Sequence, residues 1–502
     1  MPDRHRHDWA HIAVASIDGR IEVEGRLRCE FGRPPDLTAS WSWDGVRLEV
    51  KSDPFGFRPL FYWADAHRLI VAESVNPILC RIGNPSLDLT ALSVLLRSGH
   101  ILGDDTPFLG VRQLGPNGVL TWSSTKGLEV RAGPRPAGTL RAGIDREEAI
   151  REYARLFQQA VEQSHAASDR ERLVVPLSGG RDSRHIAFAL HAAGVMPAAY
   201  ATALHQPWRA DEDARVAGLV AQALGAPHVV IPQRGASLRN CVDMVRETSF
   251  LTNEHGWQLP LRDWVTTNAD AVVDGIGGDV MSAALGQSMD LHASFQERDY
   301  EKVIRQVSDP SKFAGWEGIL PRGLRNALSA DIARRRLRQE LELHADHHNP
   351  ARSFFFWNRT RKQIGQSPFC LFRRVRVATP YLMPELWAFL DSLPFDIVAD
   401  RTFHDETIAR AYPTLAAIPY ADETARRPFR RNEALGVSLA FLRLLWSLRT
   451  DTAIRLPRMT GRGIRSLMDH RVWWSHLGAL YLLSLLSVPS LEIDEHDRSP
   501  RG

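Results

Sequence analysis

The chain contains Leu173-Val174-Val175-Pro176-Leu177-Ser178-Gly179-Gly180-Arg181-Asp182-Ser183, the pattern of a buried strand, a glycine-rich turn and a helix that begins near Asp182. The two glycines let the backbone curl, so that its N–H groups approach an anion, and the helix N-terminus adds further donors. Ser178 and Ser183 supply hydroxyl groups, and Asp182 can hold Mg²⁺ against phosphate oxygens. The stretch therefore predicts a pyrophosphate cradle suited to cleavage of ATP into AMP and pyrophosphate. It is not a Walker loop, because no Gly-Lys-Ser/Thr follows.

Strand and helix patterns alternate around this stretch. The expected strands are 174–177, 198–203, 229–231 and 271–274, and the expected helices are 147–166, 182–193, 211–224 and 237–247. Such alternation, with almost continuously apolar strands, predicts a parallel sheet with helices on both faces. Ligands of such sheets bind beyond the carboxyl ends of the strands.

A second glycine-rich segment, Asp274-Gly275-Ile276-Gly277-Gly278-Asp279, also directly follows a strand. Its glycines allow a ligand to approach the backbone closely. The carboxylate of Asp279 can complete, with Asp182, the protein ligands of a magnesium ion on the pyrophosphate. Taken alone, the segment would more simply be interpreted as a turn with solvated acids. Its position about a hundred residues after the cradle favours the interpretation as a second part of the pyrophosphate site.

The chain before this region has a different pattern. Residues 10–80 and 111–130 contain short alternating apolar and polar runs, typical of antiparallel strands, with a helix over 87–98. A Pro/Gly-rich linker at 131–138 marks a boundary. Beyond about residue 290 we expect mostly helices, including 435–448 and 472–486.

Composition narrows the class of protein. The chain has 502 residues, is 44% hydrophobic and carries a net charge of +3, which gives no case for a nucleic-acid binder. The four scattered cysteines form no zinc pattern and are expected to be buried thiols in a reducing compartment. The N-terminus lacks an apolar signal region, and the segment 472–488 falls short of a membrane span. We expect a soluble, cytoplasmic protein.

The string Ser-Gly-Gly-x-Asp-Ser resembles the PP-loop of the N-type ATP pyrophosphatases, and the chain as a whole resembles the asparagine synthetase family. The resemblance covers roughly residues 10–430 in the same order of elements. Besides the two glycine-rich segments, it rests on 53–62, 72–74, 106–116, 199–202, 211–217, 379–382 and 393–394.

The resemblance implies an α/β protein with three parts. Residues 1–135 would form an Ntn-type antiparallel β-sandwich (α+β) similar to a class II glutaminase, 145–435 a PP-loop parallel α/β synthetase domain, and 436–502 a helical extension. ATP and Mg²⁺ are the implied cofactors. The implied ATP and pyrophosphate ligands are Leu177, Ser178, Gly179, Gly180, Asp182, Ser183, Thr202, Asp274 and Gly275, with Asp182 and Asp279 as catalytic and metal-binding residues.

Several positions depart from the family. Position 2 is Pro instead of the nucleophilic Cys, and Cys29 is internal, so we expect no glutamine hydrolysis by that mechanism. The family's Arg-Gly-Pro-Asp string is missing, and the segment 32–36 is only loosely similar to it. Val280 stands where the family has Glu after Asp279.

The other departures concern charge and the base. The chain has no lysine after Lys362, so Arg401, Arg426 or Arg427 would have to supply the charge of the family's lysine near the acyl-adenylate. Candidates for a tyrosine base are Tyr381, Tyr412 and Tyr420. Arg181, Arg184 and His185 make the helix after the cradle basic, either as a second anion contact or, by default, as a solvated face.

Three functions stay open. The first is an ATP-dependent amide ligase that adenylates an aspartate-like carboxylate and uses ammonia, free or delivered by a separate amidotransferase. The second, as in β-lactam synthetases and lasso-peptide cyclases, closes a ring within a small molecule or a precursor peptide. The third is a binding protein with an inactive synthetase fold. None involves nucleic acid or a membrane.

Overall fold

The computed structural model describes residues 9–421 apart from 19, 167–170, 206–210, 234–236, 253, 309–319 and 321. Beyond 421 it describes only residues 435, 438, 439, 441–443, 446, 461, 464, 481, 484 and 485. The expected helices 435–448 and 472–486 therefore lie mostly outside the described residues, and Pro2, Arg426 and Arg427 lie wholly outside them.

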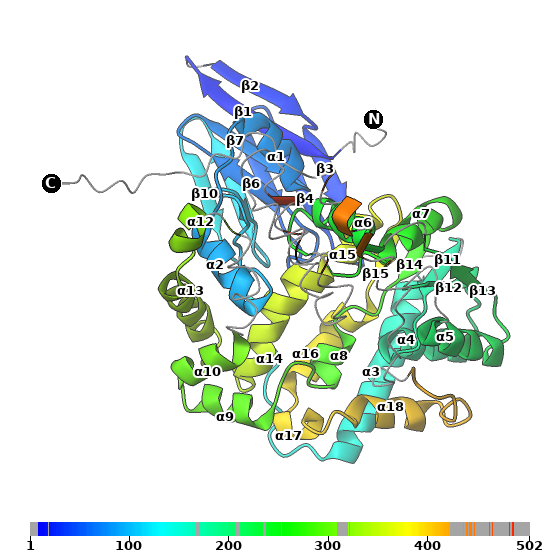
Figure 1. Cartoon of the computed structure of the whole chain (residues 1–502). Helices are drawn as coiled ribbons and strands as arrows, with labels where there is room; N and C mark the ends of the chain where they lie inside the picture. The colour runs from blue at the N-terminus through cyan, green and yellow to red at the C-terminus, as the bar shows by residue number, and fades with distance from the viewer. Residues whose placement is uncertain are drawn as a thin grey trace.

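The first part of the chain forms two antiparallel sheets, coloured blue to cyan at the top of Figure 1. One sheet, ordered β2-β1-β7-β6-β8, contains β1 (His11–Ile17), β2 (Arg20–Gly25), β6 (Phe61–Ala64), β7 (Arg68–Ala72) and β8 (Arg112–Gln113). The other, ordered β10-β9-β5-β4-β3, contains β3 (Arg28–Phe31), β4 (Ala39–Trp43), β5 (Arg47–Lys51), β9 (Val119–Ser123) and β10 (Gly127–Arg131). Val14, Trp41 and Leu120 belong to one buried core that both sheets share. The predicted antiparallel strands are thus confirmed.

Two helices of this part begin at side-chain caps. The hydroxyl of Ser74 accepts from the N–H of Asn76 at the start of α1 (Val75–Ile82). The carboxylate of Asp88 accepts from the N–H of Ala91 at the start of α2 (Leu89–Ser98). Each cap satisfies an N–H that the helix leaves without a partner. The expected helix over 87–98 is confirmed and begins two residues later.

A parallel sheet follows, ordered β13-β12-β11-β14-β15 and lying to the right in Figure 1. Its strands are β11 (Leu173–Pro176), β12 (Ala199–Ala203), β13 (His228–Ile231), β14 (Ala271–Val273) and β15 (Arg376–Ala378). Val174 pairs with Ala199 on one side and with Val272 on the other, all in parallel. The alternation of strand and helix therefore predicted the sheet correctly. It missed β15, a three-residue strand that has no alternating pattern of its own.

One helix, α3 (Arg146–Ala166), precedes the first of these strands. The helices that follow the successive strands are α4 (Asp182–Ala192), α5 (Glu212–Ala223), α6 (Ser237–Glu247), α7 (Gln258–Asn268) and α8 (Gly278–Ser282). The apolar side chains of α3, such as Ile150, Phe157 and Val161, are buried in the same core as Val174 and Val272 of the sheet. Burial of this apolar face, more than intrinsic helix propensity, stabilises such helices.

Beyond residue 288 the described elements are helical apart from β15. They are α9 (Met289–Gln296), α10 (Tyr300–Val307), α12 (Arg322–Ala327), α13 (Ala330–Glu342), α14 (Pro350–Phe355), the π-helix η1 (Phe356–Gly365), α15 (Ser367–Leu371), the 3₁₀-helix η2 (Pro380–Leu382), α16 (Pro384–Ser392), α17 (Phe395–Val398) and α18 (Phe403–Ala411). Among the described residues, no helix is long and apolar enough to cross a bilayer.

The π-helix η1 contacts the antiparallel part through two buried basic side chains. Arg361 donates to Asp104 Oδ1 at 3.0 Å, and Lys362 Nζ donates to Gln113 Oε1 at 2.6 Å and to the carbonyl oxygen of Asp105 at 3.0 Å. Burial lowers the pKa of Lys362 to about 7, and the neighbouring charge of Arg361 acts in the same direction. Polar contacts thus join η1 to the segment 104–113.

All four cysteines are free. Cys241 and Cys370 are buried as expected, and burial raises the pKa of both thiols. Cys80 is exposed and Cys29 is half-buried, so the expectation of four buried thiols is wrong for these two.

Candidate functional site

The two glycine-rich turns lie side by side, because they follow the neighbouring parallel strands β11 and β14. The backbone N–H of Asp279 donates to Asp182 Oδ2 at 3.2 Å. Glycine is required for this approach. A Cβ on Gly278 would lie 2.5 Å from Asp182 Oδ1, and a Cβ on Gly275 would lie 2.8 Å from the Cβ of Asp182. The glycines therefore serve to admit the side chain of Asp182 between the turns.

Internal hydrogen bonds hold the first turn. The N–H of Ser178 donates to Ser183 Oγ at 3.0 Å, and the N–H of Gly180 donates to Ser178 Oγ at 3.2 Å. The N–H of Gly179 donates to Asp213 Oδ1 at 2.8 Å, so α5 fixes the turn from outside. At the start of α4, Arg181 gives no side-chain cap to the first-turn amides. That leaves the helix N-terminus with donors for an anion.

A pocket of about 360 Å³ opens over the two turns. Of the predicted ligands it is lined by Leu177, Ser178, Asp182, Ser183, Thr202, Asp274, Gly275 and Asp279. Gly179 and Gly180 belong to the first turn but do not line the pocket. The structure thus brings the predicted residues together around one cavity, and their roles stay predictions.

Negative charge is concentrated in this pocket. Burial and the neighbouring charge of Asp279 raise the pKa of Asp182 well above its ordinary value. Burial also raises the pKa of Asp274 to about 6. Asp182 Oδ1 is buried and has no hydrogen-bond partner. A cation at this oxygen would relieve both the desolvation and the repulsion.

The donor set fits Mg²⁺ bound together with phosphate. Within the described ranges, no cluster of three or more His, Cys, Asp or Glu could hold a metal by itself. Mg²⁺ commonly takes one or two protein carboxylates and completes its octahedron with waters and substrate phosphates. Asp182 and Asp279 provide such a pair beside the turn that offers phosphate donors.

The pocket also contains residues that the sequence did not indicate. Asp213, His255, Trp257, Arg359 and Thr360 line it. The guanidinium of Arg359 lies 3.9 Å from a carboxylate oxygen of Glu254, and the buried hydroxyl of Thr360 has no hydrogen-bond partner. Arg359 and Thr360 belong to η1. A π-helix often marks a functional site, but the residues 356–365 carry no sequence pattern that would identify one.

Arg184 and His185 of α4 do not form a solvated face, which corrects the default interpretation for these two residues. Arg184 is 2% exposed and His185 is fully buried. Arg184 donates to the carbonyl oxygens of Ile418 at 2.7 Å and Pro419 at 2.6 Å. Arg181 is ion-paired with Asp405 of α18. The segment 418–419 and α18 cover this side of the helix, so its cations contact protein groups.

The other candidates lie outside the lining of the pocket. Tyr381 is buried against His185 and His404, Tyr412 donates to Gln158 Oε1 at 3.0 Å, and Tyr420 lies under the guanidinium of Arg184. Arg401 donates to the carbonyl oxygen of Gln287 at 3.3 Å. The structure therefore brings neither a predicted tyrosine base nor Arg401 to the cavity wall.

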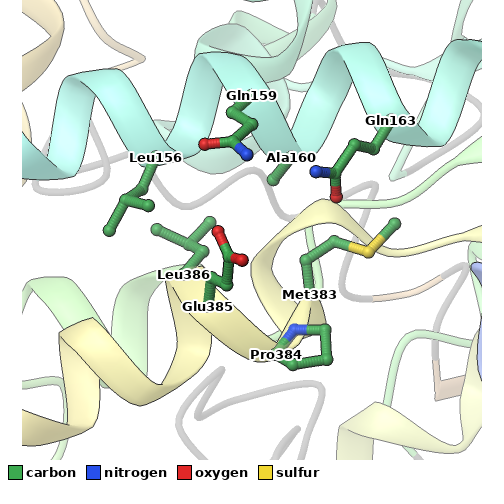
Figure 2. A pocket seen from close by; sticks show the side chains of 8 residues that line it. All are labelled: Leu156, Gln159, Ala160, Gln163, Met383, Pro384, Glu385 and Leu386. Carbon is green, nitrogen blue, oxygen red and sulfur yellow. The ribbon is translucent and has the colours of Figure 1, made fainter.

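A second hollow of about 240 Å³ lies between α3 and the start of α16. Figure 2 shows its lining, in which Gln159, Gln163 and Glu385 are the polar side chains. It contains none of the predicted site residues, and the two glycine-rich turns do not contribute to it.

Comparisons with known proteins give little. No family model and no curated protein matches the chain. One similar solved structure is described as glutamine phosphoribosylpyrophosphate (PRPP) amidotransferase from B. subtilis complexed with ADP and GMP, at 12% identity over 41% of this chain and 44% of that one, with a TM-score of 0.14. Another, the allosteric regulatory enzyme of purine biosynthesis, has 12% identity over 39% of this chain and 46% of that one, also with a TM-score of 0.14. The chain thus spans less than half the length of either protein, and TM-scores this low decide neither fold nor function.

Proposed function

We propose that the chain is an ATP-dependent amide-forming ligase that releases AMP and pyrophosphate. The observation that carries this proposal is the close contact between the two glycine-rich turns. There, Asp182 and Asp279 lie together at the carboxyl ends of β11 and β14, and one of their oxygens is buried without a partner. A phosphate-binding turn beside a carboxylate pair suits the handling of a nucleoside triphosphate.

The chemistry proceeds in two steps. An oxygen of the substrate carboxylate attacks the α-phosphorus of ATP, the bond to the bridging oxygen of the β-phosphate breaks, and pyrophosphate leaves. An amine then attacks the acyl carbon, loses a proton and displaces AMP. The hydroxyls of Ser178 and Ser183 and the first amides of α4 are suited to bind the departing pyrophosphate.

Asp182 and Asp279 would hold Mg²⁺, which when bound supplies positive charge to the leaving pyrophosphate. The glycines 275 and 278 keep the Asp182 carboxylate within reach of the second turn, since any Cβ there would displace it. Thr202, whose hydroxyl donates to the carbonyl oxygen of Leu177 at 2.6 Å, orders the wall at which we place the adenosine.

A second candidate, ring closure within a larger carboxylate, is favoured by apolar side chains in the pocket lining. They are Val280, Leu285, Ile364 and Phe372. An apolar wall fits a substrate that is bulkier than aspartate, such as a β-amino acid or a peptide. In that case the amine belongs to the substrate itself, and the protein partner is a precursor peptide in place of an ammonia-delivering amidotransferase.

The test is pyrophosphate release from Mg·ATP across a panel of carboxylates, with aspartate plus ammonia first and peptides and β-amino acids second. D182N is the blank, and D346N, which changes a surface carboxylate with a 92% exposed side chain, is the matched control. Release that requires one carboxylate, persists in D346N and vanishes in D182N would support the proposal. ATP binding without release for any carboxylate would instead favour an inactive binding protein.

A further inference from the structure

Four polar side chains without a role in the proposed reaction lie behind Asp182, away from the pocket lining. They are Ser282 of α8, His404 of α18, His185 of α4 and Tyr381 of η2, and the side chains of all four are fully buried. His404 is central among them. Its Nδ1 lies 3.0 Å from Ser282 Oγ, and its Nε2 lies 3.1 Å from His185 Nδ1 and 3.3 Å from the hydroxyl of Tyr381.

The hydrogen bonds assign the tautomer of His404. Ser282 Oγ lies 2.7 Å from the carbonyl oxygen of Gly278, which can only accept, so the serine hydroxyl donates there. Ser282 Oγ must then accept from Nδ1–H of His404. At the other ring nitrogen, Nε2 accepts from His185 or Tyr381. In the neutral ring these partners place the proton on Nδ1.

Nδ1 of His404 is also near the predicted metal ligand, so the N–H that Ser282 orients can be shared between Ser282 and Asp182. Nδ1 of His404 lies 3.5 Å from Asp182 Oδ1, the buried oxygen that has no hydrogen-bond partner. The other oxygen, Oδ2, is held by the N–H of Asp279. One carboxylate oxygen is therefore fixed by a backbone donor, and a ring N–H of fixed tautomer lies behind the other.

We propose that His404 is a positioning residue that, oriented by Ser282, holds the carboxylate of Asp182 in the direction from which it binds a divalent cation with ATP. The inference rests on the proposed function. Groups that orient a metal ligand from behind typically change metal affinity 10–100-fold when they are removed. The proposed role of His404 depends on which ring nitrogen carries the proton. It requires a hydrogen-bond donor at the position of Nδ1 and no donor at the position of Nε2.

The experiment measures Mn²⁺ binding in the presence of ATP by electron paramagnetic resonance, which needs no turnover. H404N keeps an amide donor near the place of Nδ1, H404Q moves it toward the place of Nε2, and H404L removes it. We expect H404N to bind Mn²⁺ within about 3-fold of the wild type, and H404Q and H404L to bind about 10–100-fold more weakly. S282A, which removes the acceptor that sets the tautomer, should weaken binding in the same direction.

H344L is the matched control, because His344 is equally buried but contacts Ser353 and Glu340 instead of the turns. It should bind Mn²⁺ like the wild type. S282A decides the matter should the His404 variants fail to fold, as judged by thermal unfolding. Wild-type affinity in H404Q, H404L and S282A would overturn the positioning role and leave the proposed function standing. Failure of the wild type itself to bind Mn²⁺ with ATP would overturn the proposed function, and this inference with it.

Discussion

Asp182 and Asp279, 97 positions apart in the chain, are joined by the hydrogen bond from the backbone N–H of Asp279 to Asp182 Oδ2 at 3.2 Å. The bond exists because β11 and β14 are neighbouring parallel strands whose carboxyl ends meet at the same edge of the sheet. It brings two acidic residues together. Burial and the neighbouring charge of Asp279 raise the pKa of Asp182, and the hydrogen bond itself opposes that rise. This close pair of acidic residues does not by itself stabilise the fold, since like charges at close range oppose folding.

The first prediction concerns the space between the turns. In G278A the new methyl group would lie 2.5 Å from the carboxylate of Asp182, so the carboxylate must move. We expect Mg·ATP to bind about 10–100-fold more weakly, as for other disturbances of metal-ligand geometry. Isothermal titration measures the affinity.

G323A is the control for this substitution. Gly323 lies in α12, and a Cβ there would meet no atom within 4 Å. It should bind Mg·ATP like the wild type. Unchanged affinity in G278A would show that the joint between the turns is not where the cation binds.

A second prediction concerns the acceptor for the N–H of Gly179. Asp213 Oδ1 holds this N–H at 2.8 Å and thereby orders the first turn. D213N keeps an oxygen acceptor and removes a negative charge from the pocket, so it should bind ATP at least as tightly as the wild type. D213A removes the acceptor and should bind ATP about 5–30-fold more weakly, the equivalent of about 1–2 kcal/mol for one lost hydrogen bond. Equal affinities of D213A and D213N would contradict an ordering role.

The core of the site could be predicted from the sequence because it depends on local rules. Each glycine-rich turn directly follows an apolar strand, and in a parallel sheet the carboxyl ends of neighbouring strands lie together. Val174 and Val272 pair as that rule requires. The antiparallel strands β4 and β5 were predicted for a similar reason, since half-buried strands alternate apolar and polar residues.

The remainder depends on tertiary packing. Arg359 and Thr360 reach the pocket from η1, about 180 residues after the first turn, and no spacing in the sequence connects them. Arg184 and His185 have the composition of a solvated helix face, but α18 and the segment 418–419 cover them. His404 stands in an unremarkable amphipathic helix. Only the folded chain places it behind Asp182.

The third prediction concerns this covering segment. The guanidinium of Arg184 is buried, donates to two carbonyl oxygens and lies 4.1 Å from the ring centroid of Tyr420. R184M leaves both carbonyls without their donor and should lower the free energy of unfolding by about 3 kcal/mol. The free energy of unfolding of R184K should lie between those of the wild type and R184M, because one ammonium cannot reproduce the forked donors of the guanidinium. Urea denaturation measures both.

R215M is the control for the loss of an arginine. Arg215 pairs with Glu212 on the exposed surface of α5, where such a pair contributes about 0–1 kcal/mol. A loss in R184M no larger than in R215M would mean that the contact between α4 and residues 418–419 does not stabilise the fold.

The last prediction concerns Lys362, which is buried between η1 and the antiparallel part. Burial lowers its pKa from 10.5 to about 7, so the folded protein favours the neutral amine and the unfolded chain favours the ammonium. Burial of the ammonium therefore destabilises the folded protein below the folded pKa, and this penalty is relieved as the pH rises toward the unfolded pKa. Relative to K362M, which cannot titrate, the wild type should therefore gain about 2–3 kcal/mol between pH 7 and pH 9, from 1.36 kcal/mol per pH unit.

Urea denaturation at a series of pH values measures this difference. K302M is the control, because Lys302 is an exposed lysine paired with Asp290 and stays protonated over the same range. Its stability should run parallel to that of the wild type. If the stability of K362M also ran parallel to that of the wild type, Lys362 would be charged in the folded protein over the whole pH range. The polar contact between η1 and residues 105–113 would then be a buried ammonium bound by two oxygens, and the loss of its charge in K362M would destabilise the protein equally at every pH.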